Sequence, residues 1–315
     1  MRIEILKQKH LLFLKGYPEE DIDIILKTAF QFREVLDRPK KKVPSLQGVT
    51  VVNLFFEDST RTRISFELAQ KRLSADTVNF SASSSSLKKG ESFKDTVQNI
   101  MAMKIDAIVM RHPTPGSPKH LTEFIDAVVV NAGDGTHEHP TQAILDMMSL
   151  KEKFGYLKGL KVGIVGDIAH SRVARSNIYG LLTMGAKVTV CGPPNLIPRH
   201  ILDLGANINF NLDEVMEWSD ALNVLRIQKE RMGRPLIPSI REYRASFGIT
   251  LERLKNHKKE ITIMHPGPMN RGVEIDGAVA DSDQAIILDQ VLNGVASRMA
   301  ILYCLCSGHS GESIK

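Results

Sequence analysis

The sequence predicts an α/β protein with two domains, each a parallel β-sheet flanked by helices. Short apolar runs rich in β-branched residues alternate with amphipathic segments through residues 1–150, a pattern typical of a parallel sheet with helical crossovers. The alternation restarts at 160–167, and a chain of 315 residues is long enough for two cores. We therefore expect one domain at 1–150, a second at 151–287, and a C-terminal helix within 288–315 that packs back on the first domain.

The composition is that of a globular protein outside membranes. Hydrophobic residues make up 43% and charged residues 24% of the chain. No run approaches the ~18 apolar residues that a membrane span needs, and residues 1–15 lack the features of a secretory signal. Cys191, Cys304 and Cys306 show no metal-ligand spacing, so we expect reduced thiols and a cytoplasmic location.

The net charge of +5 raises the alternative of nucleic-acid binding. The only dense basic run, at 38–42, has no aromatic residues between its charges, and aromatic residues are only 6% of the chain, so stacking surfaces are scarce. Small anionic substrates explain the positive charge more economically, and we expect no nucleic-acid partner.

Five consecutive residues that can bind an anion follow the first predicted strand, at 51–56. They are Ser59, Thr60, Arg61, Thr62 and Arg63. Apolar residues at helical spacing predict a helix from about 64 to 73, so the five lie where a strand turns into a helix. Backbone N–H groups there lack intrahelical partners, and the helix dipole favours an anion. Hydroxyl and guanidinium donors beside them suit a phosphate dianion, whereas a merely capped helix would not need five donors.

A serine-rich segment at 81–86 precedes Lys88 and Lys89. By composition it is a flexible loop and could be a simple linker. Hydroxyls followed by paired lysines could equally form a second anion-binding set. The residues alone leave these two interpretations open.

Further polar residues follow the next strands of the first half. The strand at 107–110 leads to Arg111, and the strand after it leads to the segment that contains His139 and Gln142. Ligands of open parallel sheets bind at the carboxyl ends of the strands, so we expect these residues to converge with Arg61 on one site.

Three common kinds of site do not fit the pattern. His137 and His139 could share a metal ion, but no other Cys or His lies nearby at ligand spacing, so we expect no metal. No Gly-x-Ser-x-Gly marks a serine nucleophile. The turn at 166–172 follows a strand as in a dinucleotide-binding unit, but it lacks the G-x-G-x-x-G pattern.

The second half places basic residues at strand ends. Arg172 follows its first strand, and Arg226 and Gln228 end another with alternate side chains on one face. Two arginines could bind a dicarboxylate, although they could also be surface salt-bridge partners. The loop 265–268 holds two prolines and could present rigid carbonyl groups to an amine.

These motifs resemble those of the aspartate/ornithine carbamoyltransferase family. Residues 56–67 are similar to the carbamoyl-phosphate signature of the family, and 139–142 to its second motif. Residues 226–231 and 265–268 resemble the catalytic chains that act on aspartate, and the two loops typical of the ornithine enzymes are not found. The similarity runs from about 53 to 306.

The resemblance implies transfer of the carbamoyl group from carbamoyl phosphate to the α-amino group of L-aspartate. The products would be N-carbamoyl-L-aspartate and phosphate, an early step of pyrimidine (UMP) biosynthesis. No cofactor is implied, because the substrate amine is itself the nucleophile.

The resemblance also implies a role for each residue. The phosphate would be held by Ser59, Thr60, Arg61 and Thr62, with Arg61 countering the charge of the leaving group. The carbonyl oxygen would accept from Thr62, Arg111 and His139. The carbamoyl amide would be oriented by Gln142 and by carbonyl groups around Pro268. Aspartate would be bound by Lys89, Arg172, Arg226, Gln228 and Gly267.

In this family the active site is shared across a trimer, with a serine and a lysine contributed by the neighbouring subunit. The matching positions are Ser85 and Lys89, so the resemblance favours the functional interpretation of the serine-rich segment. It implies a homotrimer. It also allows a regulatory chain or a dihydroorotase partner, but no residue of this chain indicates either one.

Two positions depart from the family pattern. Asp58 stands where proline is usual, which puts an acid beside the phosphate site, and Gly267 stands where larger apolar residues are common. The closest rival function is carbamoyl transfer to ornithine, which would need an acidic pocket rather than Arg172 and Arg226. A non-catalytic assembly protein would lack some of the phosphate or carbonyl ligands, and all are present.

Overall fold

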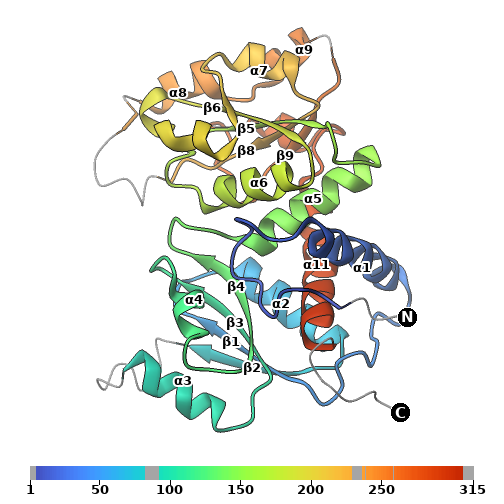
Figure 1. The fold of residues 1–315 in the computed structure, drawn as a ribbon. Helices are drawn as coiled ribbons and strands as arrows, with labels where there is room; N and C mark the ends of the chain where they lie inside the picture. Colours follow the sequence, from blue (N-terminus) through green and yellow to red (C-terminus); the bar gives the residue numbers. More distant parts are fainter. Residues whose placement is uncertain (1–4, 82–91, 229–235, 238, 258, 308–315) are drawn as a thin grey trace. The chain divides into compact units, whose positions relative to one another are not determined.

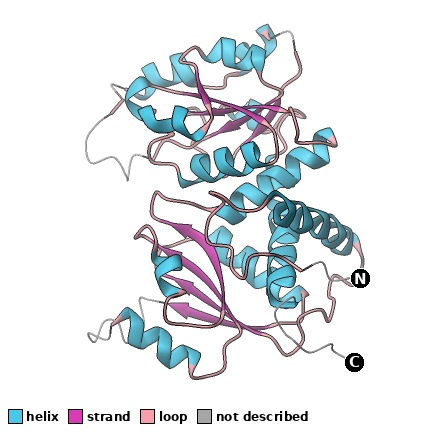
Figure 2. Cartoon of the chain, in the orientation of Figure 1, coloured by secondary structure: helices cyan, strands magenta, loops and turns pink. Residues whose placement is uncertain are grey.

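The chain forms two compact units. The computed structural model describes residues 5–81, 92–228, 236–237, 239–257 and 259–307. The first unit combines Met1–Met148 with Leu292–Lys315, and the second is Ser149–Val291. Each unit contains one parallel sheet flanked by helices, so the predicted fold class is confirmed (Figures 1 and 2).

The sheet of the first unit has the strand order β2-β1-β3-β4. Its strands are β1 (Thr50–Phe55), β2 (Asp76–Ser81), β3 (Ala107–His112) and β4 (Val128–Asp134). All three pairings are parallel, which places the carboxyl ends of β1, β3 and β4 side by side at one edge. Valine- and isoleucine-rich strands covered on both faces are typical of such a sheet.

Helices cover both faces of this sheet. They are α1 (Glu19–Asp37), α2 (Thr60–Arg72), α3 (Phe93–Met101), α4 (Ser117–Leu121) and α5 (Pro140–Phe154). Alternation along β1 separates the two layers, since Val52 and Leu54 join the core formed with α3 and α4. Asn53 faces the other way, where its side chain exchanges two hydrogen bonds of 3.0 and 2.8 Å with Gln70 of α2.

The sheet of the second unit has the order β7-β6-β5-β8-β9, again all parallel. Its strands are β5 (Lys161–Val165), β6 (Lys187–Cys191), β7 (Asn207–Ile208), β8 (Ala221–Val224) and β9 (Thr262–Met264). Its helices are α6 (Arg172–Thr183), η3 (Pro194–Leu196), η4 (Arg199–Leu204), α7 (Leu212–Trp218), α8 (Ile240–Phe247), α9 (Leu251–Asn256) and α10 (Gly277–Ala280). The strand order is that of doubly wound folds, which bind ligands where the order reverses, beside β5.

The C-terminal helix α11 (Ile287–Ser307) returns to the first unit, as expected. It contacts three helices there. Cys304 donates to Thr28 of α1, Arg298 donates to Ser65 of α2, and Ser297 donates to Met148 of α5. The helix is therefore a structural part of the first unit, and its apolar surface is explained by this burial.

Two elements differ from the sequence-based expectation. Helix α2 begins at Thr60, not near residue 64, so the anion-binding residues occupy its first turn. Strand β2 was not predicted, because its alternating sequence Asp-Thr-Val-Asn-Phe-Ser carries few apolar residues. None of the helices in the described part of the chain is long and apolar enough to cross a membrane.

Candidate active site

The first turn of α2 is the centre of the predicted phosphate site. Ser59 is the N-cap residue, with an extended backbone at φ −158°, yet its side chain makes no capping hydrogen bond to the helix. Its carbonyl group accepts from the N–H of Arg63 at 3.1 Å, which starts the helix. Thr60 and Arg61 are exposed, and Thr62 is buried. The first N–H groups of the helix and the surrounding donors therefore face a position that suits an anion.

Asp58 lies next to this turn and is exposed. A carboxylate just before a helix N-terminus interacts favourably with the helix dipole. Its negative charge partly neutralises the positive potential that would attract a phosphate. The departure of Asp58 from the family pattern should therefore weaken phosphate binding.

Arg111 is held beside the same turn. Strands β1 and β3 pair Phe55 with Arg111, and the N–H of Phe56 donates to the Arg111 carbonyl at 2.9 Å. The guanidinium lies 3.1 Å from Glu57 through Nε and donates to the Ala132 carbonyl at 3.3 Å. Two anchors on neighbouring segments thus fix the orientation of this cation, and one of them, Glu57, was not among the predicted site residues.

His139 and Gln142 lie after β4, at the start of α5. His139 does not end β4 but directly precedes α5, and it is 4% exposed. Its Nδ1 lies 3.4 Å from the hydroxyl of Thr141. Gln142, in the first turn of α5, donates through Nε2 to Asp146 at 2.9 Å. The spacing of four residues on one helix could have revealed this pair from the sequence.

The loop before His139 is stabilised by Asp134. Burial opposes ionisation of this carboxyl, but hydrogen bonds from His137, Asn131 and the Gly116 N–H outweigh it and lower the pKa of Asp134. His137 lies 3.0 Å from Asp134, so the two histidines of the motif have different partners. Among the described residues, no three His, Cys, Asp or Glu side chains are grouped for a metal ion.

In the second unit, Arg172 is the first residue of α6 and is 3% exposed. The N-cap residue Ser171 accepts from the Ala174 N–H at 3.1 Å and sets where the helix begins. The preceding turn is filled by a pair of side chains, since His170 lies 2.9 Å from the buried Asp167. This turn has no open glycine backbone for a pyrophosphate.

Arg226 and Gln228 follow β8, the neighbour of β5. Both are partly exposed, whereas Leu225 and Ile227 between them are buried. This alternation puts the arginine and the glutamine on one side of the chain, as predicted. Arg172 and Arg226 thus come from the carboxyl ends of two adjacent strands.

The loop after β9 is fixed by His265, which is fully buried in its side chain. Its Nδ1 accepts from the Gly267 N–H at 2.8 Å, and its Nε2 lies 3.4 Å from Glu274. Gly267 takes a φ of +63°, a left-handed conformation that glycine adopts readily, and the following bond to Pro268 is cis. Ser85 and Lys89, predicted to come from a neighbouring subunit, lie outside the described residues.

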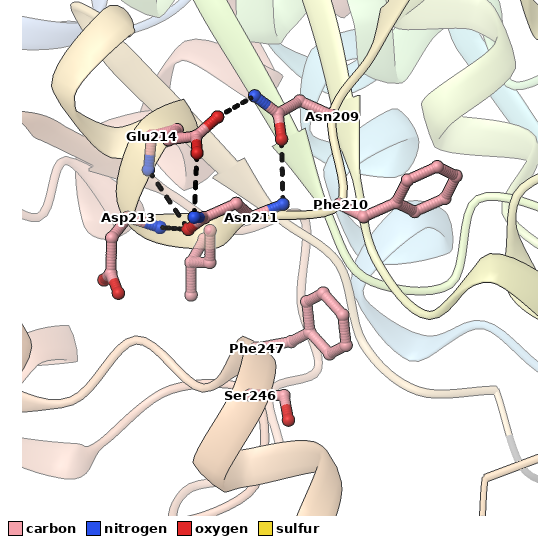
Figure 3. Close-up of a pocket in the computed structure, with 8 residues that line it drawn as sticks. Asn209, Phe210, Asn211, Asp213, Glu214, Ser246 and Phe247 are labelled. Atoms are coloured by element: carbon pink, nitrogen blue, oxygen red, sulfur yellow. Dashed lines mark hydrogen bonds between the residues drawn. The ribbon is translucent and has the colours of Figure 1, made fainter.

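A cavity of about 560 Å³ in the second unit is distinct from these residues. It lies beyond the edge strand β7, between the start of α7 and the end of α8 (Figure 3). Asn211 caps α7 and also donates to Glu214 at 2.9 Å, beside Asp213 and the rings of Phe210 and Phe247. Its two carboxylates disfavour an anionic substrate, and it contains no predicted site residue.

Comparison with known proteins shows which family the chain belongs to. The family model described as "Aspartate/ornithine carbamoyltransferase, carbamoyl-P binding domain" matches residues 9–152. The model described as "Aspartate/ornithine carbamoyltransferase, Asp/Orn binding domain" matches residues 158–305. The chain belongs to the aspartate/ornithine carbamoyltransferase family.

Relatives in this family are similar over nearly the whole chain. The aspartate carbamoyltransferase catalytic subunit of Christiangramia forsetii is 60% identical over 298 residues, 95% of this chain and 96% of the relative. That of Cytophaga hutchinsonii is 60% identical over 300 residues, 95% and 98% of the two chains.

Solved structures of carbamoyltransferases share the fold. The catalytic subunit of M. jannaschii aspartate transcarbamoylase superposes with a TM-score of 0.86 at 35% identity, covering 97% of this chain and 100% of that one. Aspartate transcarbamoylase from Trypanosoma cruzi in complex with N-(phosphonacetyl)-L-aspartic acid gives 0.87 at 32% identity, covering 95% and 96%.

Proposed function

We propose that this protein is an aspartate carbamoyltransferase. It transfers the carbamoyl group of carbamoyl phosphate to the α-amino group of L-aspartate and so serves pyrimidine biosynthesis. The observation that carries the proposal is the 60% identity, over 95% of the chain, to catalytic subunits of that name. The chemistry of the described residues agrees with it.

In this proposal residues 1–150 bind carbamoyl phosphate and 151–287 bind aspartate, in line with the descriptions of the two matching family models. Ser59, Thr60, Arg61 and Thr62 hold the phosphate at the start of α2. Arg111 and His139, with Thr62, donate to the carbonyl oxygen, which becomes an oxyanion in the tetrahedral intermediate.

The remaining residues position the two substrate nitrogens, the α-amino group of aspartate and the NH₂ of the carbamoyl group. Arg172, Arg226 and Gln228 seat the aspartate carboxylates, and Gln142 with the carbonyl groups around Pro268 orients the carbamoyl nitrogen. The neutral amine attacks the carbonyl carbon and a C–N bond forms. The C–O bond to phosphate then breaks with its electron pair on the phosphate oxygen, and the leaving phosphate takes up the proton that the attacking nitrogen loses. The protein contributes positioning and preorganised charge, and positioning alone is worth up to ~7–11 kcal/mol.

The family substrate that competes with aspartate is ornithine. A second cation on the substrate would face Arg172 and Arg226, which disfavours ornithine by charge repulsion. The test is release of phosphate from carbamoyl phosphate with L-aspartate and L-ornithine in parallel. We expect release with aspartate alone. Release with ornithine alone would contradict the assignment of the second unit, and silence with both would contradict the enzymatic proposal.

We further propose a homotrimer in which Ser85 and Lys89 of one subunit complete the site of the next. The exposed apolar side chains Ile64 and Leu68 of α2 and Val78 of the edge strand β2 support an interface on this side of the first unit. Lys89→Ala is expected to keep the trimer in light scattering and lose most activity. The neighbouring substitution Lys88→Ala is the control, and equal loss in both variants would contradict the role of Lys89.

Further protein partners of the trimer can be tested directly. The relatives are catalytic subunits, so co-elution with a regulatory chain or with dihydroorotase is the measurement that extends the proposal. We place the enzyme in the cytoplasm, which agrees with its three buried free cysteines.

A further inference from the structure

The amide of Gln142 is held in one orientation by a buried carboxylate. Its Nε2 donates to Oδ1 of Asp146 at 2.9 Å, and Asp146 is fully buried. An ionised carboxylate can only accept hydrogen bonds, so the amide must present its nitrogen to Asp146. The opposite end of the amide, Oε1, accepts no hydrogen bond from any residue that the structure describes, and Gln142 keeps 8% of its surface exposed.

Asp146 has a buried counter-charge on α11. The guanidinium of Arg298 is fully enclosed, and burial lowers its pKa to about 10 while the charge of Asp146 acts in the opposite direction. The same guanidinium donates to Ser65 at 3.0 Å and lies 5.1 Å over the ring of Phe66. The electrostatic interaction between Arg298 and Asp146 thus links α11 to α5.

These contacts join two parts of the candidate site. Ser65 and Phe66 belong to α2, whose first turn carries the phosphate ligands, and Asp146 belongs to α5, which carries Gln142. All of these groups lie in the first unit. The orientation of the Gln142 amide is therefore built into the packing of α2, α5 and α11.

We infer that Asp146 determines the specificity for the carbamoyl group by turning the Gln142 carbonyl oxygen toward the substrate. Asp146 is a positioning residue and acts only through Gln142. The inference rests on the proposed function, because it assumes that the ligand beside Gln142 is carbamoyl phosphate.

The chemical consequence concerns the substrate nitrogen. The carbamoyl group has an NH₂ that donates, whereas the acetyl group of acetyl phosphate has a methyl group of nearly the same shape. A site with a fixed acceptor rejects the analogue that lacks the donor, because the acceptor is then left unpaired. With the amide reversed, an N–H group would face the substrate NH₂ and the preference would disappear.

The test compares binding of carbamoyl phosphate and acetyl phosphate to the full-length protein without aspartate. In Asp146→Asn the new side-chain NH₂ pulls the Gln142 oxygen toward itself. We expect the Kd for carbamoyl phosphate to rise about tenfold, the value of one lost hydrogen bond, while the Kd for acetyl phosphate stays unchanged. An equal rise for both ligands, or no change for either, would overturn the inference.

A double variant tests the direction of the hydrogen bond. Combining Asp146→Asn with Gln142→Glu restores an N–H···O contact in the reverse sense and keeps one negative charge within the pair. One oxygen of the new carboxylate then faces the substrate, so the preference for carbamoyl over acetyl phosphate is expected to return. If Asp146→Asn alone fails to fold, the double variant still tests the inference. A double variant that does not prefer carbamoyl over acetyl phosphate would contradict it.

The matched control is Asp21→Asn. Asp21 is as buried as Asp146, accepts from the backbone N–H groups of Lys7 and Gln8, and makes no hydrogen bond to Gln142 or another predicted site residue in the described part of the chain. It should reduce stability without changing the ratio of the two Kd values. A wild-type protein that does not prefer carbamoyl phosphate over acetyl phosphate would also overturn the inference, whereas the proposed function fails only if no phosphate is released with aspartate.

Discussion

At the scale of single residues, the candidate site is defined by side chains that are fixed before a substrate arrives. The Arg111 guanidinium has anchors on Glu57 and on the Ala132 carbonyl, and the His265 ring accepts from the Gly267 N–H. A donor held in place needs no reorganisation when charge develops on the substrate, which is how preorganised sites stabilise transition states.

Asp58 is the residue that works against this arrangement. Asp58→Asn removes one exposed negative charge next to the α2 N-terminus. We expect the KM for carbamoyl phosphate to fall about two- to fivefold at low ionic strength, the range of a single charge at a helix end. The effect should shrink in high salt, because exposed charges are screened. The exposed Asp289→Asn on α11 is the control, and an equal change there would refute the local explanation.

At the scale of elements, the start of α6 determines the place of Arg172. The hydroxyl of Ser171 caps the helix by accepting from the Ala174 N–H. Since Arg172 is the next residue and is buried, any fraying of this cap moves its guanidinium.

Ser171→Ala tests this link. Loss of the cap should reduce the free energy of unfolding by about 0.5–2 kcal/mol. It should also raise the KM for aspartate without raising that for carbamoyl phosphate. Asn211→Ala removes the equivalent cap of α7, where no site residue follows, and should lower stability alone. Steady-state kinetics and urea unfolding of the two variants separate the outcomes, and a matching rise in KM with Asn211→Ala would contradict the assignment.

Most elements that position the site were predictable from the sequence. The apolar strands before Arg111, Arg172 and the 265–268 loop are buried parallel strands, as their composition indicates. The start of α2 was misjudged because its first four residues, Thr-Arg-Thr-Arg, contain no apolar side chain that a periodic pattern could detect. Edge strand β2 was missed for a similar reason, since it carries few apolar residues.

The partners of the site residues were the least predictable part. The sequence contains Glu57 and Asp146, but it does not show that they contact Arg111 and Gln142, because such contacts depend on how strands and helices pack. Only Asp146 carried a local signal, its spacing of four residues from Gln142 on one helix.

At the scale of the whole molecule, stability depends on buried carboxylates such as Asp134. Its pKa lies below the ordinary value of 3.8, so its ionised form stabilises the fold above pH 3.8, and this contribution disappears as the pH falls through the lower native value. Asp134→Asn should therefore lower the free energy of unfolding by about 1–3 kcal/mol at neutral pH. The difference from wild type should narrow in strong acid.

Urea unfolding at pH 7 and at pH 3 measures this narrowing. Asp126→Asn serves as the control, because the Asp126 carboxylate pairs with Lys9 at a fully exposed position and should contribute little. A difference between wild type and Asp134→Asn that stays constant with pH would show that the carboxylate acts only through its shape.

The return of α11 to the first unit has a consequence for how the protein is made. Ile301, Leu302 and Leu305 are fully buried in that unit, yet the ribosome reaches them only after the whole of residues 149–291 has been synthesised. During translation the second unit can close its core while the first still exposes the apolar surface that α11 will cover. The unit that carries the phosphate ligands is thus completed last, and its apolar surface is the one that a chaperone would meet on the nascent chain.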